Sequence, residues 1–290
     1  MNYYALAQKI SQSIKQALIE DLIAPISEGE LPPSPANLKS IHKVDHLATK
    51  VLLEVLEGFN CNIYVESHSL QQHRNAKFSI FVDPVDGSLN WDRRVGDPCI
   101  VVAISEKTKE IKLKDLEFAY VEGLRSGDIY YTEASASYYI NYLIQKNIQI
   151  QCQGKPCLAD AIAYLRPGYS LAKQQLEASL PVFLLCRDIR AFDNAGMEIC
   201  EIARNAADLM IEARKGSDNF NLLSYPILKY AGGILCDLDG NSLDEINMEL
   251  EQQIDYIVCN HQLLLAEVLL ILQTMKKSRC YTKDNLRFSY

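Results

Sequence analysis

The sequence predicts a layered α/β protein built from two parts, and three observations lead to this prediction. Apolar residues recur at helical spacing near the start of the chain, short strand-like runs follow in the middle, and helix and strand patterns alternate in the last third. The segment Cys152–Cys157, which contains Gly154 and Pro156, has the composition of a boundary. We therefore expect an N-terminal α+β subdomain over residues 1–150 and a C-terminal α/β subdomain over residues 151–290.

The composition is that of an ordinary globular protein, because 48% of the 290 residues are hydrophobic and 23% are charged. The formal net charge is −8 and no long basic block occurs, so we expect no nucleic acid polymer as a partner. The Cys residues are odd in number and lack zinc-site spacing, which indicates reduced thiols in a cytoplasmic protein. The sequence lacks the pattern of a signal peptide, and no apolar run reaches membrane-spanning length, so we expect no membrane association.

Two helices are predicted before the first strand. Residues 2–24 carry apolar side chains at helical spacing, and a proline follows them. Residues 29–35 are rich in proline and predict a loop, after which residues 38–59 predict a second helix with one apolar face. The next short run predicts a strand that ends at Glu66, in front of a polar loop.

The apolar run Phe78–Val82 predicts a buried strand that stops at a turn with two carboxylates. Asp83 and Asp86 carry these carboxylates, and the carbonyl of Val85 lies between them. Gly87 follows and lets the backbone come close to a ligand. Oxygen donors of this kind suit a hard cation such as Mg²⁺. The alternative is an ordinary Asp-Pro or Asp-Gly turn after a strand.

The rest of the chain continues the two patterns. The middle predicts an antiparallel sheet, with strand-like runs at Cys99–Ser105, Leu116–Val121 and Asp128–Tyr131. The last part alternates between helix-like and strand-like segments, which are Asp160–Arg166, Leu171–Ser179, Pro181–Cys186, Ala195–Ala207, Leu209–Ala213, Leu222–Tyr230 and Ile234–Asp237. Such alternation predicts an α/β layer.

Three parts of the sequence together resemble one known family. Residues Asp83–Asn90, Asp-Pro-Val-Asp-Gly-Ser-Leu-Asn, are similar to the Asp-Pro-(Ile/Val/Leu)-Asp-Gly-Thr/Ser-x-Asn signature of the inositol monophosphatase family. Glu198–Glu212 resembles the family's helix-then-strand segment, and Ala231–Gly233 followed by Asp237–Gly240 resembles its closing motif. The resemblance spans roughly residues 40–270. It implies a fold of αβαβα layers like that of fructose-1,6-bisphosphatase, dependence on Mg²⁺ and a homodimer.

The resemblance implies a metal cluster. Glu66, Asp83 and the Val85 carbonyl would hold a first Mg²⁺. Asp83 and Asp86 would share a second Mg²⁺ with a further Asp. Two or three divalent cations can offset the charge of a phosphate dianion, activate a water and stabilise the leaving alkoxide.

The resemblance also implies roles in activating water and in binding substrate. Glu66 would hold the attacking water, and the pair of Ser88 and Asp45 would orient it. The N–H groups of Gly87 and Ser88 would cradle the phosphate, and Glu212 would meet a hydroxyl of the sugar. Without the resemblance, Asp45 is an ordinary carboxylate near the start of a helix, and Glu212 is an exposed residue at the end of a strand.

The sequence departs from the family where a third metal-binding Asp is expected. Counting back from Ala231–Gly233, that position falls on Phe220. The candidates that could replace it are Asp218, Asn219 and Asn221. Because Mg²⁺ selects charged oxygen donors, we expect tight binding at the first site and weak binding at the second.

Further differences concern the same region. Pro226 interrupts a regular helix that begins at the family's usual place. The pair Asp193-Asn194 stands where the family has Gly-Ser/Thr beside the substrate. A competing expectation is that Asp218 swings into the second metal site, helped by a hinge at Gly216.

The function predicted from these residues is a Mg²⁺-dependent phosphomonoesterase. Its partner would be a small-molecule phosphate monoester, namely a polyol or sugar phosphate such as myo-inositol monophosphate. The first alternative is a family member with weakened catalysis and a binding or regulatory role, because the third Asp is missing. The second alternative is a fructose-1,6-bisphosphatase or 3′-phosphonucleotide phosphatase specificity on the same scaffold.

Overall fold

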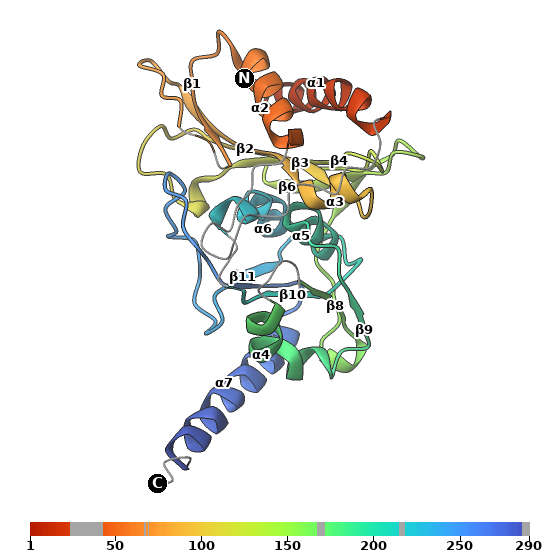
Figure 1. The fold of residues 1–290 in the computed structure, drawn as a ribbon, viewed down its shortest axis with the longest axis vertical. Helices are drawn as coiled ribbons and strands as arrows, with labels where there is room; N and C mark the ends of the chain where they lie inside the picture. Colours follow the sequence, from red (N-terminus) through yellow and green to blue (C-terminus); the bar gives the residue numbers. More distant parts are fainter. Residues whose placement is uncertain (24–42, 67, 69, 167–171, 215–217, 286–290) are drawn as a thin grey trace.

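The computed structural model describes residues 1–23, 43–66, 68, 70–166, 172–214 and 218–285, and these residues form five alternating layers (Figure 1). A pair of helices covers the outer face of a first sheet, and two short helices lie between this sheet and a second one. Another pair of helices covers the far face of the second sheet. The predicted αβαβα order is confirmed.

The first sheet has seven strands in the order of the chain. They are β1 (Cys61–Val65), β2 (Phe78–Asp86), β3 (Cys99–Ser105), β4 (Phe118–Gly123), β5 (Ile129–Glu133), β6 (Ala136–Ile140) and β7 (Asn147–Ile150). β1 runs parallel to β2, and all the later neighbours are antiparallel. β6 and β7 extend the sheet beyond the predicted strands. They were not predicted because their residues are largely half-buried or exposed and do not form an apolar run.

Helices α1 (Tyr3–Ile23) and α2 (Lys43–Leu56) form the first layer. They agree with the predicted helices in the described part of the chain, except that α2 ends at Leu56 and not at residue 59. The loop predicted over 29–35 lies outside the described residues. Ile80 and Val82 of β2 pack against these helices, whereas Phe81 packs on the opposite face. Because side chains alternate along a strand, Asp83 follows Phe81 towards the middle of the molecule.

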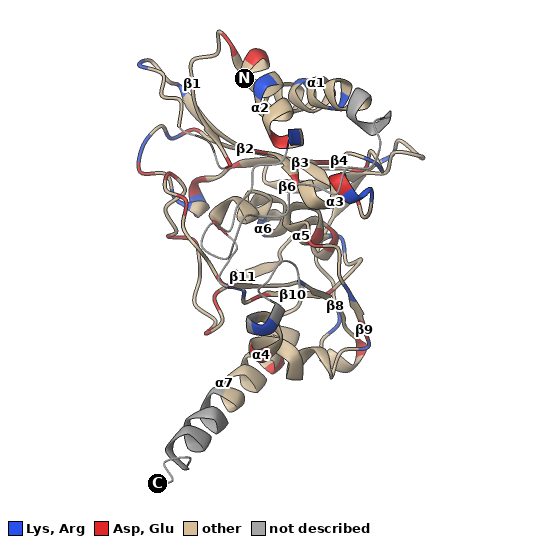
Figure 2. Ribbon diagram, viewed as in Figure 1, with Lys and Arg blue, Asp and Glu red and all other residues tan. Residues whose placement is uncertain are grey.

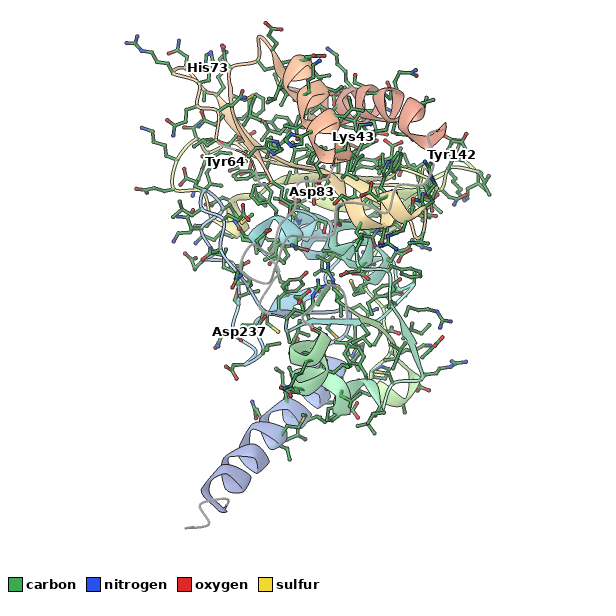
Figure 3. The ribbon with its side chains drawn as sticks, viewed as in Figure 1. Lys43, Tyr64, His73, Asp83, Tyr142 and Asp237 are labelled. Carbon is green, nitrogen blue, oxygen red and sulfur yellow. The ribbon has the colours of Figure 1, made fainter. Side chains whose placement is uncertain are left out.

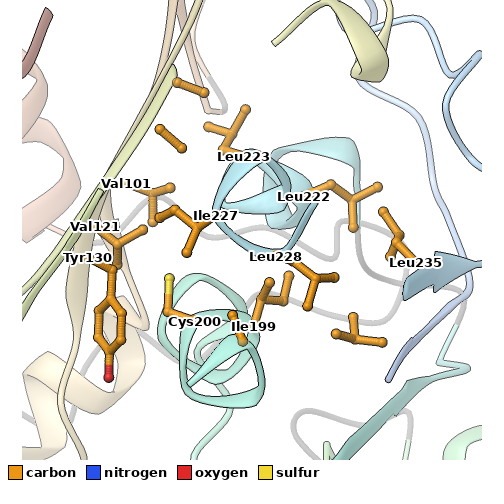
Figure 4. Packing of buried hydrophobic residues seen from close by; sticks show 14 of the residues in the cluster. Val101, Val121, Tyr130, Ile199, Cys200, Leu222, Leu223, Ile227, Leu228 and Leu235 are labelled. Carbon is orange, nitrogen blue, oxygen red and sulfur yellow. The ribbon is translucent and has the colours of Figure 1, made fainter. Parts of the chain in front are cut away.

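The middle layer consists of α5 (Ala195–Ala203) and α6 (Tyr225–Tyr230), with the 3₁₀ turn η4 (Asn219–Leu222) in front of α6. Figure 4 shows Val101 and Val121 of the first sheet beside Cys200 of α5 and Ile227 of α6. Pro226 lies in the first turn of α6, where the missing N–H of proline removes no helical hydrogen bond. The predicted interruption is therefore resolved by a helix that begins just before the proline.

The second sheet has the order β11 (Ile234–Cys236), β12 (Tyr256–Cys259), β10 (Leu209–Glu212), β8 (Ile162–Leu165) and β9 (Asp188–Arg190). Helices α4 (Ala172–Phe183) and α7 (Gln262–Asn285) cover its outer side, and α7 projects from the body of the molecule (Figure 1). The predicted break between Ser179 and Pro181 is wrong, because α4 continues through Pro181. This proline lies near the end of the helix, where a lost hydrogen bond disturbs few residues.

Short helical segments connect these elements. They are the helix α3 (Ser88–Arg93) and the 3₁₀ turns η1 (Leu113–Asp115) and η2 (Leu158–Asp160). The first sheet ends at Ile150 and β8 opens the second sheet, whereas the subdomain limits of 1–150 and 151–290 stay a prediction. Lys and Arg are scattered over the described elements and do not gather on one of them (Figure 2). No helix in the described ranges is long and apolar enough to cross a membrane.

The packing of α1 gives a first testable prediction. The Ile14 side chain is fully buried, whereas Ile19 on the same helix is 49% exposed. Ile14→Ala should lower the free energy of unfolding by about 2–4 kcal/mol, because it removes buried methyl groups and leaves a cavity. The matched control Ile19→Ala should change it by less than about 0.5 kcal/mol. Urea unfolding followed by circular dichroism measures both, and equal losses would contradict the packing described here.

Candidate active site

The Asp side chains of β2 lie at the C-terminal end of the strand, and both are buried. β2 continues through Asp86, beyond the predicted end at Val82. Its pairing with β3 shifts register between Asp83 and Asp86. In a regular strand, side chains three residues apart point to opposite faces, and a shift of this kind re-aims them. The irregular strand end therefore allows both carboxylates to reach the same side.

Backbone N–H groups hold both carboxylates. The amide of Val85 donates a hydrogen bond of 3.1 Å to Oδ1 of Asp83. The amide of Gly196, at the start of α5, donates a hydrogen bond of 2.5 Å to Oδ2 of Asp86. This approach requires glycine, because an added Cβ at Gly196 would lie 2.4 Å from Cγ2 of Val101. The close packing of α5 on the first sheet thus fixes the position of Asp86.

Two more carboxylates come from other elements. Asp45 lies in the first turn of α2, and Glu66 directly follows β1. Burial raises the pKa of Asp83 well above its usual range, and the carboxylates of Glu66, Asp86 and Asp45 raise it further. The side chains of Asp83 and Glu66 also share a hydrogen bond. The fold thus brings together the four carboxylates that the sequence analysis singled out near the motif, and Figure 3 shows Asp83 beneath the N-terminal helices.

Burial also raises the pKa of Asp86, to about 6. The guanidinium of Arg166 and the N–H of Gly196 oppose this rise, and the carboxylates of Glu66 and Asp193 add to it. Carboxyl groups this close to one another lose their protons together only when positive charge is near. The cluster therefore has the chemistry of a cation site.

The turn after the two Asp residues lies close to the start of α5. Gly87 has a φ of 87°, in the left-handed region that favours glycine. An added Cβ at Gly87 would lie 3.2 Å from Cβ of Asn194. Ser88 begins α3 and is half-buried, so its hydroxyl and N–H directly adjoin this turn.

The donor set fits one divalent cation. Glu66, Asp83 and Asp86 supply carboxylate oxygens and Val85 supplies a carbonyl, which are the hard donors that Mg²⁺ prefers. Among the described residues, no group of three or more His, Cys, Asp or Glu side chains is already arranged around one point as a metal site. A cation would therefore have to draw these side chains closer together.

Solved structures with the same fold come from the inositol monophosphatase family. The inositol monophosphatase of Thermotoga maritima superposes with a TM-score of 0.74 at 14% identity, over 96% of this chain and 99% of that one. Inositol monophosphatase II of Staphylococcus aureus superposes with a TM-score of 0.69 at 16% identity, over the full length of both chains. At such low identity these structures establish the fold alone.

Curated relatives carry the comparison further, although no family model matches the sequence. The fructose-1,6-bisphosphatase/inositol-1-monophosphatase of Archaeoglobus fulgidus is 25% identical over 225 residues, which cover 76% of this chain and 79% of that protein. The bifunctional NADP phosphatase/NAD kinase of Methanococcus maripaludis is 24% identical over 286 residues and 91% of this chain. The chain spans about half the length of this second relative, 48%. This chain is thus similar in sequence and in fold to proteins named as inositol monophosphatases.

The residue that counting back from Ala231–Gly233 places at the inositol monophosphatase family's third Asp is a core residue. Phe220 is buried in the apolar cluster between the two sheets. The carboxylate of Asp218 caps η4, because its Oδ1 accepts a hydrogen bond of 2.8 Å from the N–H of Phe220. The swing expected for Asp218 would break this cap, and the hinge expected at Gly216 lies outside the described residues.

The remaining two candidates differ from each other. Asn219 is buried, and its side-chain oxygen accepts a hydrogen bond of 3.1 Å from the N–H of Gln252. Asn221 faces a charge, because both terminal nitrogens of the Arg166 guanidinium lie 3.4 Å from its Oδ1. Directly after the position where the inositol monophosphatase family's carboxylate is expected, this chain therefore has a neutral amide bound to an arginine.

Arg166 belongs to an ionic cluster that the sequence analysis missed. It directly follows β8, and its Nε lies 3.2 Å from Oδ1 of Asp193. Its Nε is also 3.5 Å from Oε2 of both Glu198 and Glu212. A charged residue at the end of a buried strand was an available signal, as was Arg214, two residues after Glu212 and thus on the same side of an extended chain.

Glu212, expected to meet a sugar hydroxyl, is fully buried in this cluster. The Nε of Arg214 lies 2.9 Å from its Oε1, and the Nη2 of Arg214 lies 2.8 Å from its Oε2. The Arg166 guanidinium and these contacts lower the pKa of Glu212, against the rise that burial causes. In the described conformation, both oxygens of Glu212 are thus engaged by arginine.

The carboxylate cluster predicts an unusual pH dependence of stability without metal. Because folding raises the pKa of Asp86 to about 6, its protonated form stabilises the fold below the ordinary pKa, and this contribution is lost as the pH rises through about 6. In EDTA at about pH 7.5, Asp86→Asn should therefore raise the free energy of unfolding by roughly 2 kcal/mol. The gain should shrink as the pH falls towards 4.

Urea unfolding at several pH values measures this effect. The control is Asp188→Asn, a half-buried carboxylate on β9 that pairs with Arg190, and it should give no such gain. Equal stability of wild type and Asp86→Asn at neutral pH would contradict the prediction.

Proposed function

We propose that this protein is a Mg²⁺-dependent phosphomonoesterase acting on a small polyol or sugar phosphate. The observation that carries the proposal is the convergence of Asp45, Glu66, Asp83 and Asp86 at the end of β2, in a chain similar to inositol monophosphatases. A cluster of buried carboxylates is electrostatically unfavourable by itself. In a metal-dependent phosphatase, the bound cations compensate this negative charge.

The first metal site would be formed by Glu66, Asp83 and the backbone carbonyl of Val85. A bound Mg²⁺ supplies positive charge that offsets the phosphate dianion and favours the leaving alkoxide. The N–H bond that Asp83 accepts from Val85 keeps its carboxylate fixed at the strand end. Because this bond fixes the Asp83 carboxylate, only the other ligands would have to move when a cation binds.

The attacking water would be activated by residues around the same turn. Glu66 accepts the proton of the water, and the Ser88 hydroxyl, oriented by Asp45, holds the water in line with the phosphorus. The N–H groups of Gly87 and Ser88 donate to the phosphate oxygens. The left-handed conformation of Gly87 supports this role, because it leaves the backbone uncovered by a side chain.

The substrate class follows from chemistry and from the relatives. The names of the two curated relatives are those of a fructose-1,6-bisphosphatase/inositol-1-monophosphatase and of a bifunctional NADP phosphatase/NAD kinase. Myo-inositol monophosphate, fructose 1,6-bisphosphate, NADP and a 3′-phosphonucleotide are therefore the substrates to compare. A homodimer in the cytoplasm remains our expectation for the working enzyme.

A second candidate function is that of a binding or regulatory protein with weakened catalysis. Its support is the ionic cluster around Glu212, where Arg214 engages the carboxylate expected to meet the sugar. A phosphate-release assay with Mg²⁺ against the four substrates separates the two functions. Release from at least one substrate supports the phosphatase, whereas tight binding measured by calorimetry without any release supports the alternative.

Asp83→Asn tests the phosphatase directly. Replacing this carboxylate ligand by a neutral amide would weaken cation binding and leave the phosphate charge uncompensated, so the rate should fall by about 10³-fold or more. The amide oxygen can still accept from the N–H of Val85, so the fold should be retained. Phosphate release at saturating Mg²⁺ measures the effect, with Asp188→Asn as the control. Near-normal activity of Asp83→Asn would rule out the mechanism.

A further inference from the structure

The Arg166 side chain is a fixed positive charge inside the molecule. Only 4% of its side chain is exposed, and its Nε is paired with Asp193 at 3.2 Å. Its Nη1 donates a hydrogen bond of 2.9 Å to the hydroxyl of Tyr256. A guanidinium stays charged at any pH that a folded protein tolerates. Arg166 therefore supplies a permanent cation at one defined place.

This place adjoins the region where a second metal ion is expected. Asn221, next to the register position of the missing Asp, accepts from both terminal nitrogens of Arg166 at 3.4 Å. On the other side, Asp193 precedes Gly196 by three residues, and the N–H of Gly196 donates to Oδ2 of Asp86. One short turn therefore links the carboxylate bound to Arg166 with the amide bound to Asp86.

The charges around Arg166 leave little to attract a further dication. The guanidiniums of Arg166 and Arg214 face two carboxylates, those of Asp193 and Glu212. Burial raises the pKa of each of these carboxylates, but the two arginines outweigh this effect and lower it. Burial raises the pKa of the third acid, Glu198, to about 8, so it is mostly uncharged at neutral pH. The group is thus close to neutral as a whole.

We propose that the Arg166 guanidinium takes the place of the second divalent cation. This site would then hold one metal ion, whereas the resemblance to the inositol monophosphatase family implies two ions bound by carboxylates. The inference rests on the proposed metal-dependent function. A divalent cation beside Asp86 would be repelled by the guanidinium and would find an amide at Asn221 in place of a carboxylate. Arg166 acts as a positioning residue, since it holds Asp193 and Asn221 beside the site and does not need to touch the substrate.

Counting bound Mn²⁺, which replaces Mg²⁺ and is visible by electron paramagnetic resonance, tests this proposal. Wild type should bind one ion per chain, and Asn221→Asp should still bind one, because the new carboxylate pairs with Arg166. The double variant Arg166→Gln/Asn221→Asp should bind two. The dissociation constant of its second ion should be at least about tenfold below that of any second ion in wild type.

The control variant is Arg190→Gln, which removes an exposed arginine paired with Asp188 and should leave the ion count at one. Circular dichroism melts establish that each variant is folded. If the Arg166 variants do not fold, Asn221→Asp alone decides, since two ions in this variant would show that Arg166 does not exclude the second cation. Two ions of similar affinity in wild type, or one ion in the folded double variant, would also overturn the proposal.

This count is independent of the phosphatase assay. A protein that binds one Mn²⁺ but releases phosphate from none of the four substrates would contradict the proposed function while supporting the replacement of the second cation. A protein that releases phosphate but binds two ions tightly would do the reverse. The two proposals can therefore fail separately.

Discussion

The mutual repulsion of buried carboxylates is the constraint on which the rest of this site depends. Asp83 and Asp86 are both buried at the end of one strand, and Glu66 and Asp45 add negative charge beside them. In a medium of low dielectric constant, like charges this close are costly unless something compensates them. Three kinds of compensation occur here, namely a raised pKa, hydrogen bonds from backbone N–H groups, and the guanidinium of Arg166.

The layered fold brings the groups that compensate these carboxylates to the site, because each of these groups comes from a different part of the chain. Gly196 reaches Asp86 only because α5 packs directly on β3, where no side chain larger than hydrogen fits beside Val101. Arg166 reaches the region because β8 of the second sheet ends there. The two sheets thus act as rigid supports that bring strand ends to opposite sides of one polar cluster.

Most of the correct predictions from the sequence came from local patterns of neighbouring residues. The strand before Asp83, the helical periodicity before β1 and the alternation after residue 160 are properties of neighbouring residues, and the structure agrees with them. The break expected at Pro181 is wrong, since a proline near the end of a helix costs little. The charged residues at the ends of β8 and β10 could be noticed in the sequence, but their contacts with η4 and the turn before α5 could not be predicted, because no local pattern reports contacts between distant segments.

The proposed exchange of a divalent cation for a guanidinium would change what the site can do. A metal ion binds a phosphate oxygen directly and accepts its charge, whereas Arg166 is fully engaged by Asp193, Asn221 and Tyr256 and acts through its field. Its charge is also present at every Mg²⁺ concentration, so this part of the site's positive charge does not depend on the ion supply. If Arg166 replaces the second ion, the site would stabilise the leaving alkoxide less than two metal ions would, and it would also need less metal.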